Sequence, residues 1–138
     1  MGIRRRGREF ALQVLYQIDV TRKDVGEALD LFWENFSSDE EARSFCERLV
    51  RGVIEHSDEI NGLIERYAQH WKMSRMTRID RNILRVAVYE LAHCPDIPPK
   101  VTINEAVDIG KRFGSEDSGA FINGILDQMT HHLRPPTS

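Results

Sequence analysis

The sequence predicts an all-α protein of about seven helices. Apolar residues recur every three or four positions through most of the 138 residues, which is the period of an amphipathic helix. No segment shows the alternation of apolar and polar residues that a half-buried strand requires. Helix-capping patterns, prolines and glycines separate the periodic segments. A chain of this length is expected to form one domain with its own apolar core.

Three helices are predicted in the first part of the chain. The first runs from about residue 5 to residue 21, where apolar side chains repeat every four residues. The second carries an apolar stripe over residues 25–36 and ends at the following serines. Ser38 and Glu41 form an S-x-x-E capping box, which predicts the start of the third helix.

A fourth and a fifth helix follow, separated by a connection. Ser57, followed by two acidic residues, is expected to cap the fourth helix. The stretch "HWKMSRMT", residues 70–77, is interpreted as the connection. Thr77 and Asp80 open the fifth helix, whose wide apolar arc predicts a central, largely buried position. The prolines of "HCPDIPPK" end it.

Two further helices complete the prediction. Thr102 and Glu105 form a second capping box, which is interpreted as the start of the sixth helix. That helix should end at Gly114, where a positive φ is commonly required. The seventh runs from about Asp117 to Leu133, and "RPPTS" forms a tail.

Composition narrows the class of protein. The net charge is −3 and 41% of residues are hydrophobic, as in soluble globular proteins. No run approaches the roughly 20 apolar residues of a membrane span, and the N-terminus lacks the apolar stretch of a signal peptide. We therefore expect a cytoplasmic protein. Cys46 and Cys94 are interpreted as reduced, packed thiols.

The sequence offers little evidence for an enzyme. The dinucleotide-binding, P-loop, zinc-protease and nucleophile-elbow motifs do not occur. His131 and His132 are adjacent, so on a helix they point about 100° apart and cannot easily share a metal ion. His93 and Cys94 likewise lack ligand spacing. We assign no catalytic residue, no metal and no cofactor.

The strongest functional signal is the cluster "RRRGR" at the N-terminus. Arg4 and Arg8 are four residues apart and should share a helix face, while Gly7 would let the preceding turn unwind. Tyr16 lies two turns further on near the same face, where its ring could stack on a base. Arginines beside an aromatic ring are typical of single-strand binding. The alternatives are a solvated terminus and a tyrosine at the edge of the core.

Three segments together resemble the NusB family of bacterial transcription antitermination factors. They are "RRRGREFALQVLYQIDV", "IDRNILRVAVYEL" and "IPPKVTINEAVDIGKRFGSEDSGAFINGILD", in the family's order and spacing, from Arg4 to about Asp127. The resemblance implies a non-enzymatic fold of two helical subdomains, over about residues 4–72 and 76–133. It also implies binding of single-stranded boxA RNA in ribosomal RNA leader transcripts together with NusE, a small-subunit ribosomal protein, for delivery to RNA polymerase. Some members are homodimers.

The resemblance also implies roles for individual residues. The expected RNA-binding residues match the family's arginine-rich motif, first-helix tyrosine and C-terminal turn: Arg4, Arg5, Arg6, Arg8, Tyr16, Phe113, Asp117 and Phe121. Ala120 departs from the lysine that is frequent there, which predicts weaker phosphate binding. Asp80, expected on the exposed side of its helix, is the candidate for contact with NusE.

Two other functions fit the same features. The NusB fold also forms the N-terminal domain of certain ribosomal RNA cytosine methyltransferases, although no cofactor domain is present in this sequence. In a helical protein–protein adaptor, the arginines would instead meet an acidic partner. Salt-dependent binding of boxA RNA distinguishes these readings.

Overall fold

The computed structural model describes residues 2–68 and 76–134 and contains seven α-helices in this part of the chain. This arrangement confirms the all-α prediction. The helices, in chain order, are α1 (Ile3–Thr21), α2 (Val25–Asn35), α3 (Glu40–Glu55), α4 (Ser57–Tyr67), α5 (Arg78–His93), α6 (Pro99–Phe113) and α7 (Ser118–Leu133).

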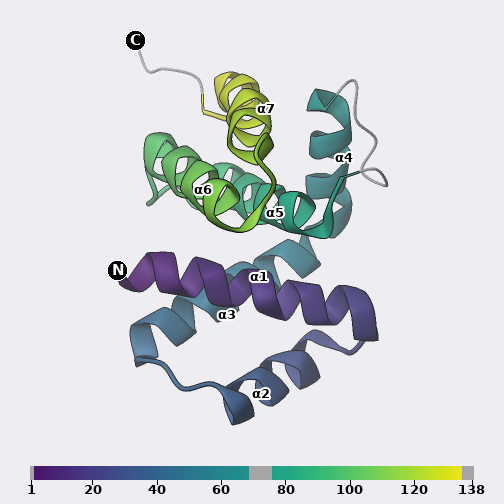
Figure 1. Cartoon of the computed structure of the whole chain (residues 1–138), viewed down its shortest axis with the longest axis vertical. Helices are drawn as coiled ribbons and strands as arrows, with labels where there is room; N and C mark the ends of the chain where they lie inside the picture. Colours follow the sequence, from purple (N-terminus) through teal and green to yellow (C-terminus); the bar gives the residue numbers. More distant parts are fainter. Residues whose placement is uncertain (1, 69–75, 135–138) are drawn as a thin grey trace.

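The helices form two groups that meet along α1 and α5 (Figure 1). One group contains α1, α2 and α3, and α1 packs along α3. The other contains α5, α6 and α7, with α4 packed against α5 and α7. Because α1 also contacts α5, it forms part of the interface between the two groups. The predicted subdomain boundary at residues 72–76 lies almost entirely outside the described residues.

The fifth helix is central, as its apolar arc predicts. It contacts α1, α3, α4, α6 and α7, and its buried apolar residues include Leu84, Val88 and Leu91. Cys46 and Cys94 are buried free thiols, as expected. Burial raises the pKa of the Cys46 thiol to about 12, so this thiol packs as an apolar group.

Helix starts differ from the predicted capping boxes. The third helix is capped by Asp39, whose carboxylate accepts a hydrogen bond from the Ala42 N–H, so Ser38 lies one residue too early. His56 is both the C-cap of the third helix and the N-cap of the fourth. Ser57 is therefore the first residue of the fourth helix and not its cap. Of the predicted boxes and caps, Thr77 is confirmed: its hydroxyl accepts from the Asp80 N–H at 3.1 Å.

The sixth helix begins three residues before the predicted box. Pro99 occupies its first position, where a missing N–H costs nothing and a fixed φ favours the helix. Thr102 is therefore buried inside the helix, and its hydroxyl donates to the Glu90 carboxylate instead of capping. The predicted capping box was wrong because Thr102 and Glu105 form contacts between helices.

Gly7 and Gly114 are needed for close packing and not for a positive φ. Gly7 lies within α1, where a Cβ would come 3.0 Å from both the Ala42 carbonyl and the Phe45 ring of α3, so the predicted unwinding there was wrong. Gly114 has φ −93°, and the expectation of a positive φ was also wrong. A Cβ at Gly114 would instead collide with the Ser118 side chain in the turn between α6 and α7.

The remaining predicted segments are the connection and the tail. Most of residues 70–77, and residues 135–138 of the tail, lie outside the described residues. Among the helices that the structure describes, none has the length and apolar character needed to cross a membrane.

Candidate nucleic-acid interface

Arg8 points into the protein and not toward solvent. Its side chain is 4% exposed, and its Nε and Nη2 groups each donate to the Glu90 carboxylate at 2.8 Å. Its Nη1 group donates to Glu105 at 3.1 Å. Glu90, 1% exposed, also accepts from the Thr102 hydroxyl at 2.8 Å. This network joins α1 to α5 and α6, so Arg8 neither belongs to a solvated terminus nor presents its charge to a phosphate.

Arg5 is also engaged within the protein. Its guanidinium forms an ion pair with Glu105 and donates to Asp108 at 3.1 Å, with 21% of the side chain exposed. The hydrogen bond to Glu105 raises the pKa of Arg5 above its usual range. Glu105 was predicted to be a capping residue, and Glu90 was not among the predicted site residues. The sequence signal for these partners is that Glu90 and Glu105 lie on helices with buried faces.

Arg4 and Arg6 present their charges to solvent. Their side chains are 51% and 43% exposed, and their ion-pair distances to Asp96 and Asp39 are each 3.7 Å. The guanidinium carbon of Arg4 lies 4.8 Å from the centre of the Phe45 ring, and that of Arg8 lies 5.2 Å from it. The two residues therefore share a helix face as predicted, although they differ completely in burial.

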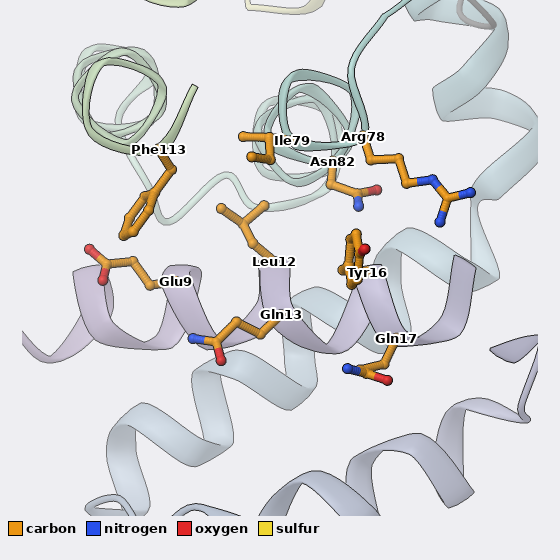
Figure 2. A pocket seen from close by; sticks show the side chains of 9 residues that line it. All are labelled: Glu9, Leu12, Gln13, Tyr16, Gln17, Arg78, Ile79, Asn82 and Phe113. Atoms are coloured by element: carbon orange, nitrogen blue, oxygen red, sulfur yellow. The ribbon is translucent and has the colours of Figure 1, made fainter. Parts of the chain in front are cut away.

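Tyr16 lies in an open groove of about 380 Å³ between α1, the start of α5 and the end of α6 (Figure 2). Tyr16 is 47% exposed. The guanidinium of Arg78, at the start of α5, lies 5.8 Å from the ring centre. Leu12 and Ile79 form an apolar floor between the two helices. Arg78 was not among the predicted site residues, because no local sequence pattern relates residue 78 to residue 16.

Phe113 closes the other end of this groove. It is the last residue of α6, is 44% exposed and points toward α1 near Glu9 (Figure 2). The guanidinium carbon of Arg112 lies 5.1 Å from the ring centre and 3.5 Å separates its Nη1 from the Glu9 carboxylate. Both ends of the groove thus carry an exposed ring beside an arginine.

The other expected residues surround a second hollow of about 210 Å³, beside the turn between α6 and α7. Asp80, Asp117 and Phe121 line it together. Asp117 is exposed at the N-cap position of α7, but its carboxylate makes no capping hydrogen bond within the described residues. Phe121 is partly buried. The sequence assigned Asp80 to a different partner from the other two, whereas the structure brings all three together.

Asp80 is the clearest departure from expectation at this hollow. It is only 8% exposed, so the prediction of an exposed side chain was wrong. Its Oδ1 atom is buried and has no hydrogen-bond partner among the described residues. Asp80 lies in the first turn of α5, where the positive end of the helix dipole favours a carboxylate. Its burial limits any contact to a group that enters the hollow.

The fold and this surface define an all-helical binding protein with an open groove of rings and cations. Such grooves suit extended ligands, because each ring offers a stacking face and each guanidinium a charge. A family comparison identifies the class further: the NusB family model matches residues 5–131.

Relatives and solved structures agree with this match. "Transcription antitermination protein NusB" of Desulfatibacillum aliphaticivorans is 53% identical over 96% of this chain and 93% of its own length. The protein of the same name from Myxococcus xanthus is 50% identical, over 99% and 100%. The solved structure of T. maritima NusB has a TM-score of 0.84 and 40% identity, covering 92% of this chain and 89% of its own.

The chain belongs to the NusB family of transcription antitermination proteins. A further solved structure, of antitermination factors NusB and NusE in complex with dsRNA, has a TM-score of 0.84 and 28% identity, over 96% of this chain and 98% of that one. Family membership confirms the sequence-based prediction of a NusB fold and of an antitermination factor rather than an enzyme.

Proposed function

We propose that this protein binds the boxA element of ribosomal RNA leader transcripts as single-stranded RNA, together with NusE, in the cytoplasm. The complex would then support processive transcription by RNA polymerase. One observation carries the proposal: an exposed ring beside an arginine at each end of the same groove, Tyr16 with Arg78 and Phe113 with Arg112. This is the chemistry that holds bases and phosphates of a flexible strand.

Two exposed arginines precede the groove along α1. Arg4 and Arg6 lie in the first turns of the helix, and Tyr16 follows about 15–18 Å further along its axis at 1.5 Å per residue. A strand that stacks on Tyr16 could therefore place phosphates near these arginines. Arg5 and Arg8 form ion pairs with carboxylates within the protein. They would therefore orient α1 and would not bind phosphate directly. We expect Arg4 and Arg6 to supply the phosphate contacts of the cluster.

NusE would dock beside the RNA, at the second hollow. A structural neighbour of this chain was solved with both NusE and dsRNA, which supports adjacent surfaces for the two ligands. Asp80, with its unpartnered Oδ1 in this hollow, could accept a hydrogen bond from an entering donor of the partner. Asp117 and Phe121 line the same hollow, and we expect them to face the RNA.

Fluorescence anisotropy with labelled boxA RNA tests the proposal. With Arg4, Arg6, Arg78 and Arg112 each neutralising a phosphate, the log–log dependence of the binding constant on salt should have a slope of about −3. A scrambled strand and a boxA duplex should bind more weakly. Replacing Arg78 with Ala should weaken binding, whereas Arg51→Ala, at an exposed arginine of α3, should not.

Three outcomes would contradict the proposal. The first is a binding constant that does not change with salt concentration, and the second is equal affinity for boxA and scrambled RNA. The third is an equal loss of RNA affinity in Arg78→Ala and Arg51→Ala. Light-scattering mass measurements with and without RNA and NusE would show whether a homodimer hides the groove. Binding of NusE without any RNA binding would support the adaptor function instead.

A further inference from the structure

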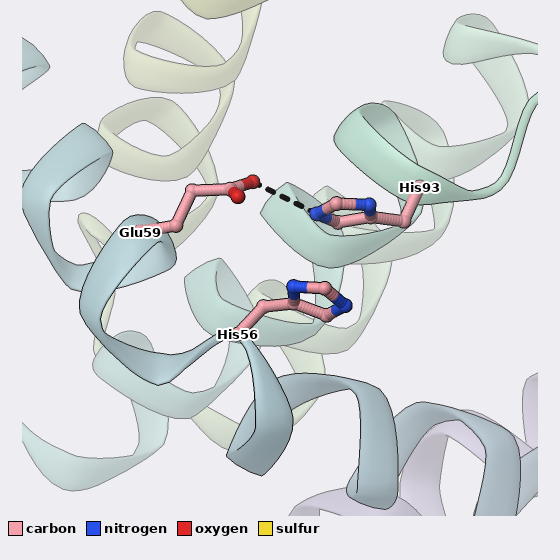
Figure 3. A group of neighbouring side chains, drawn as sticks. All are labelled: His56, Glu59 and His93. Atoms are coloured by element: carbon pink, nitrogen blue, oxygen red, sulfur yellow. Dashed lines mark hydrogen bonds and ion pairs between the residues drawn. The ribbon is translucent and has the colours of Figure 1, made fainter.

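Three side chains that can bind metal ions converge away from the groove, where α3 and α4 meet the end of α5 (Figure 3). His56 is the residue shared by α3 and α4, Glu59 lies in the first turn of α4, and His93 is the last residue of α5. One ligand atom from each residue lies within 4.8 Å of the other two. The proposed RNA contacts use none of the three.

The geometry points to a site for one divalent transition-metal ion, such as Zn²⁺, held by His56, Glu59 and His93. Two imidazoles and one carboxylate are an established donor set for such ions, with further positions completed by water. At metal–ligand distances of about 2.1 Å, tetrahedral ligand atoms lie about 3.4 Å apart. The observed separations, all within 4.8 Å, exceed that spacing by no more than about 1.4 Å.

The backbone places these donors independently of any metal. His56 and Glu59 are three residues apart at the start of α4, so they project on the same side of the helix. The His56 N–H donates to the Gly52 carbonyl at 3.0 Å, which fixes the junction between α3 and α4. The donors thus come from two segments that are 34 residues apart and are both held by regular structure.

The side chains are also partly oriented. His93 Nε2 lies 2.8 Å from the Glu59 carboxylate. The imidazole rings of His56 and His93 stack at 3.9 Å between centres, and the Tyr89 ring lies 5.6 Å from that of His93. Gly52 leaves room for Tyr89, because a Cβ there would collide with its ring. Binding a metal requires only that the Glu59–His93 contact open slightly and the His56 ring turn.

The site remains accessible to an ion from solution. The Glu59 side chain is 48% exposed and that of His93 is 29% exposed. A bound ion would tie the junction of α3 and α4 to the end of α5. Since α5 is the central helix, metal binding should stabilise the packing of the two helix groups.

Zn²⁺ titrations of the chelator-treated full chain test this inference by calorimetry and thermal unfolding. We expect saturable binding of one ion per chain and a rise in melting temperature of about 5–10 °C at a hundredfold excess over Kd. His56→Gln, Glu59→Gln and His93→Gln should each weaken binding by at least about tenfold, since losing even a supporting residue costs that much. His131→Gln, at an exposed histidine of α7, is the matched control.

Circular dichroism without Zn²⁺ checks that each variant is folded. If His93→Gln unfolds the chain, Glu59→Gln decides, because that side chain is half exposed. A wild-type Kd weaker than about 1 mM would overturn the inference, as would equal losses in His131→Gln and the three cluster variants. Binding of boxA RNA should be unchanged in Glu59→Gln, so the outcome is independent of the proposed function.

Discussion

Arg8 and Glu90 form a buried two-point ion pair that joins α1 to α5, with both hydrogen bonds at 2.8 Å. Arg8 belongs to the N-terminal arginine cluster that was predicted from the sequence to bind RNA. Burying two charges is costly, and the pair is tolerated because Thr102 and Glu105 satisfy further hydrogen-bonding positions. The cluster therefore combines a structural arginine with exposed arginines.

Replacing Arg8 with Ala should lower the free energy of unfolding by about 3–5 kcal/mol, because Glu90 would be left as an unpaired buried charge. Urea unfolding followed by circular dichroism measures this. Arg6→Ala is the control and should cost less than about 1 kcal/mol, since its ion pair is exposed. Equal stability of the two variants would show that the pair contributes nothing to the fold.

Replacing Tyr16 with Ala should cost about 1–3 kcal/mol of RNA affinity and little stability, because the residue is 47% exposed and its ring is available for stacking. Anisotropy with boxA RNA measures the affinity, and thermal unfolding measures the stability. Phe36→Ala removes a similarly exposed ring beyond the end of α2 and should leave RNA affinity unchanged. If RNA binding in Tyr16→Ala falls only in proportion to the unfolded fraction, the ring serves the fold.

Asp117→Asn should tighten boxA binding by about twofold to tenfold at low salt, because it removes a negative charge beside the proposed RNA path. The Asp117 carboxylate makes no capping hydrogen bond within the described residues, so the start of α7 should be unaffected. Anisotropy over a salt series checks both the gain and its loss at high salt. Unchanged or weaker affinity in the folded variant would place Asp117 away from the RNA or make it an acceptor from a base.

Asp96 predicts a small acid dependence of stability. The hydrogen bond from Arg48 lowers the pKa of Asp96 to about 2, from 3.8. A lowered pKa in the folded state gives stability that is complete above about pH 4 and is lost as pH falls toward 2. Asp96→Asn should therefore flatten the change in urea midpoint between pH 5 and pH 3. An identical pH profile in the variant would exclude this pair as its source.

The fold could be predicted because each helix carries its own apolar period. The arc of Leu84, Val88 and Leu91 is visible in the sequence and identifies α5 as central without any tertiary information. Helix starts were less predictable. Thr102 and Glu105 match a capping box, but their side chains form hydrogen bonds with residues of α5 and α1. A local pattern cannot show that a distant charge competes for the same side chain.

The candidate site could be predicted only in part. Tyr16 and Phe113 are exposed rings on one groove, as a stacking role requires. Arg4 and Arg8 share a helix face in the sequence, yet only the position of Glu90 makes one of them buried. Arg78 was missed for the same reason, since its position beside Tyr16 depends on how α5 packs on α1.

The partners of Arg8 have a consequence for the order of events during synthesis. Glu90 and Glu105 lie 82 and 97 residues further along the chain, so a ribosome has made most of the protein before α1 can be anchored. Contacts between such distant residues close large loops and form late in folding. A nascent chain that ends before α6 would expose its arginines without the geometry that orients them. The groove proposed for RNA, which Phe113 of α6 helps to line, would be complete only when translation of the chain is nearly finished.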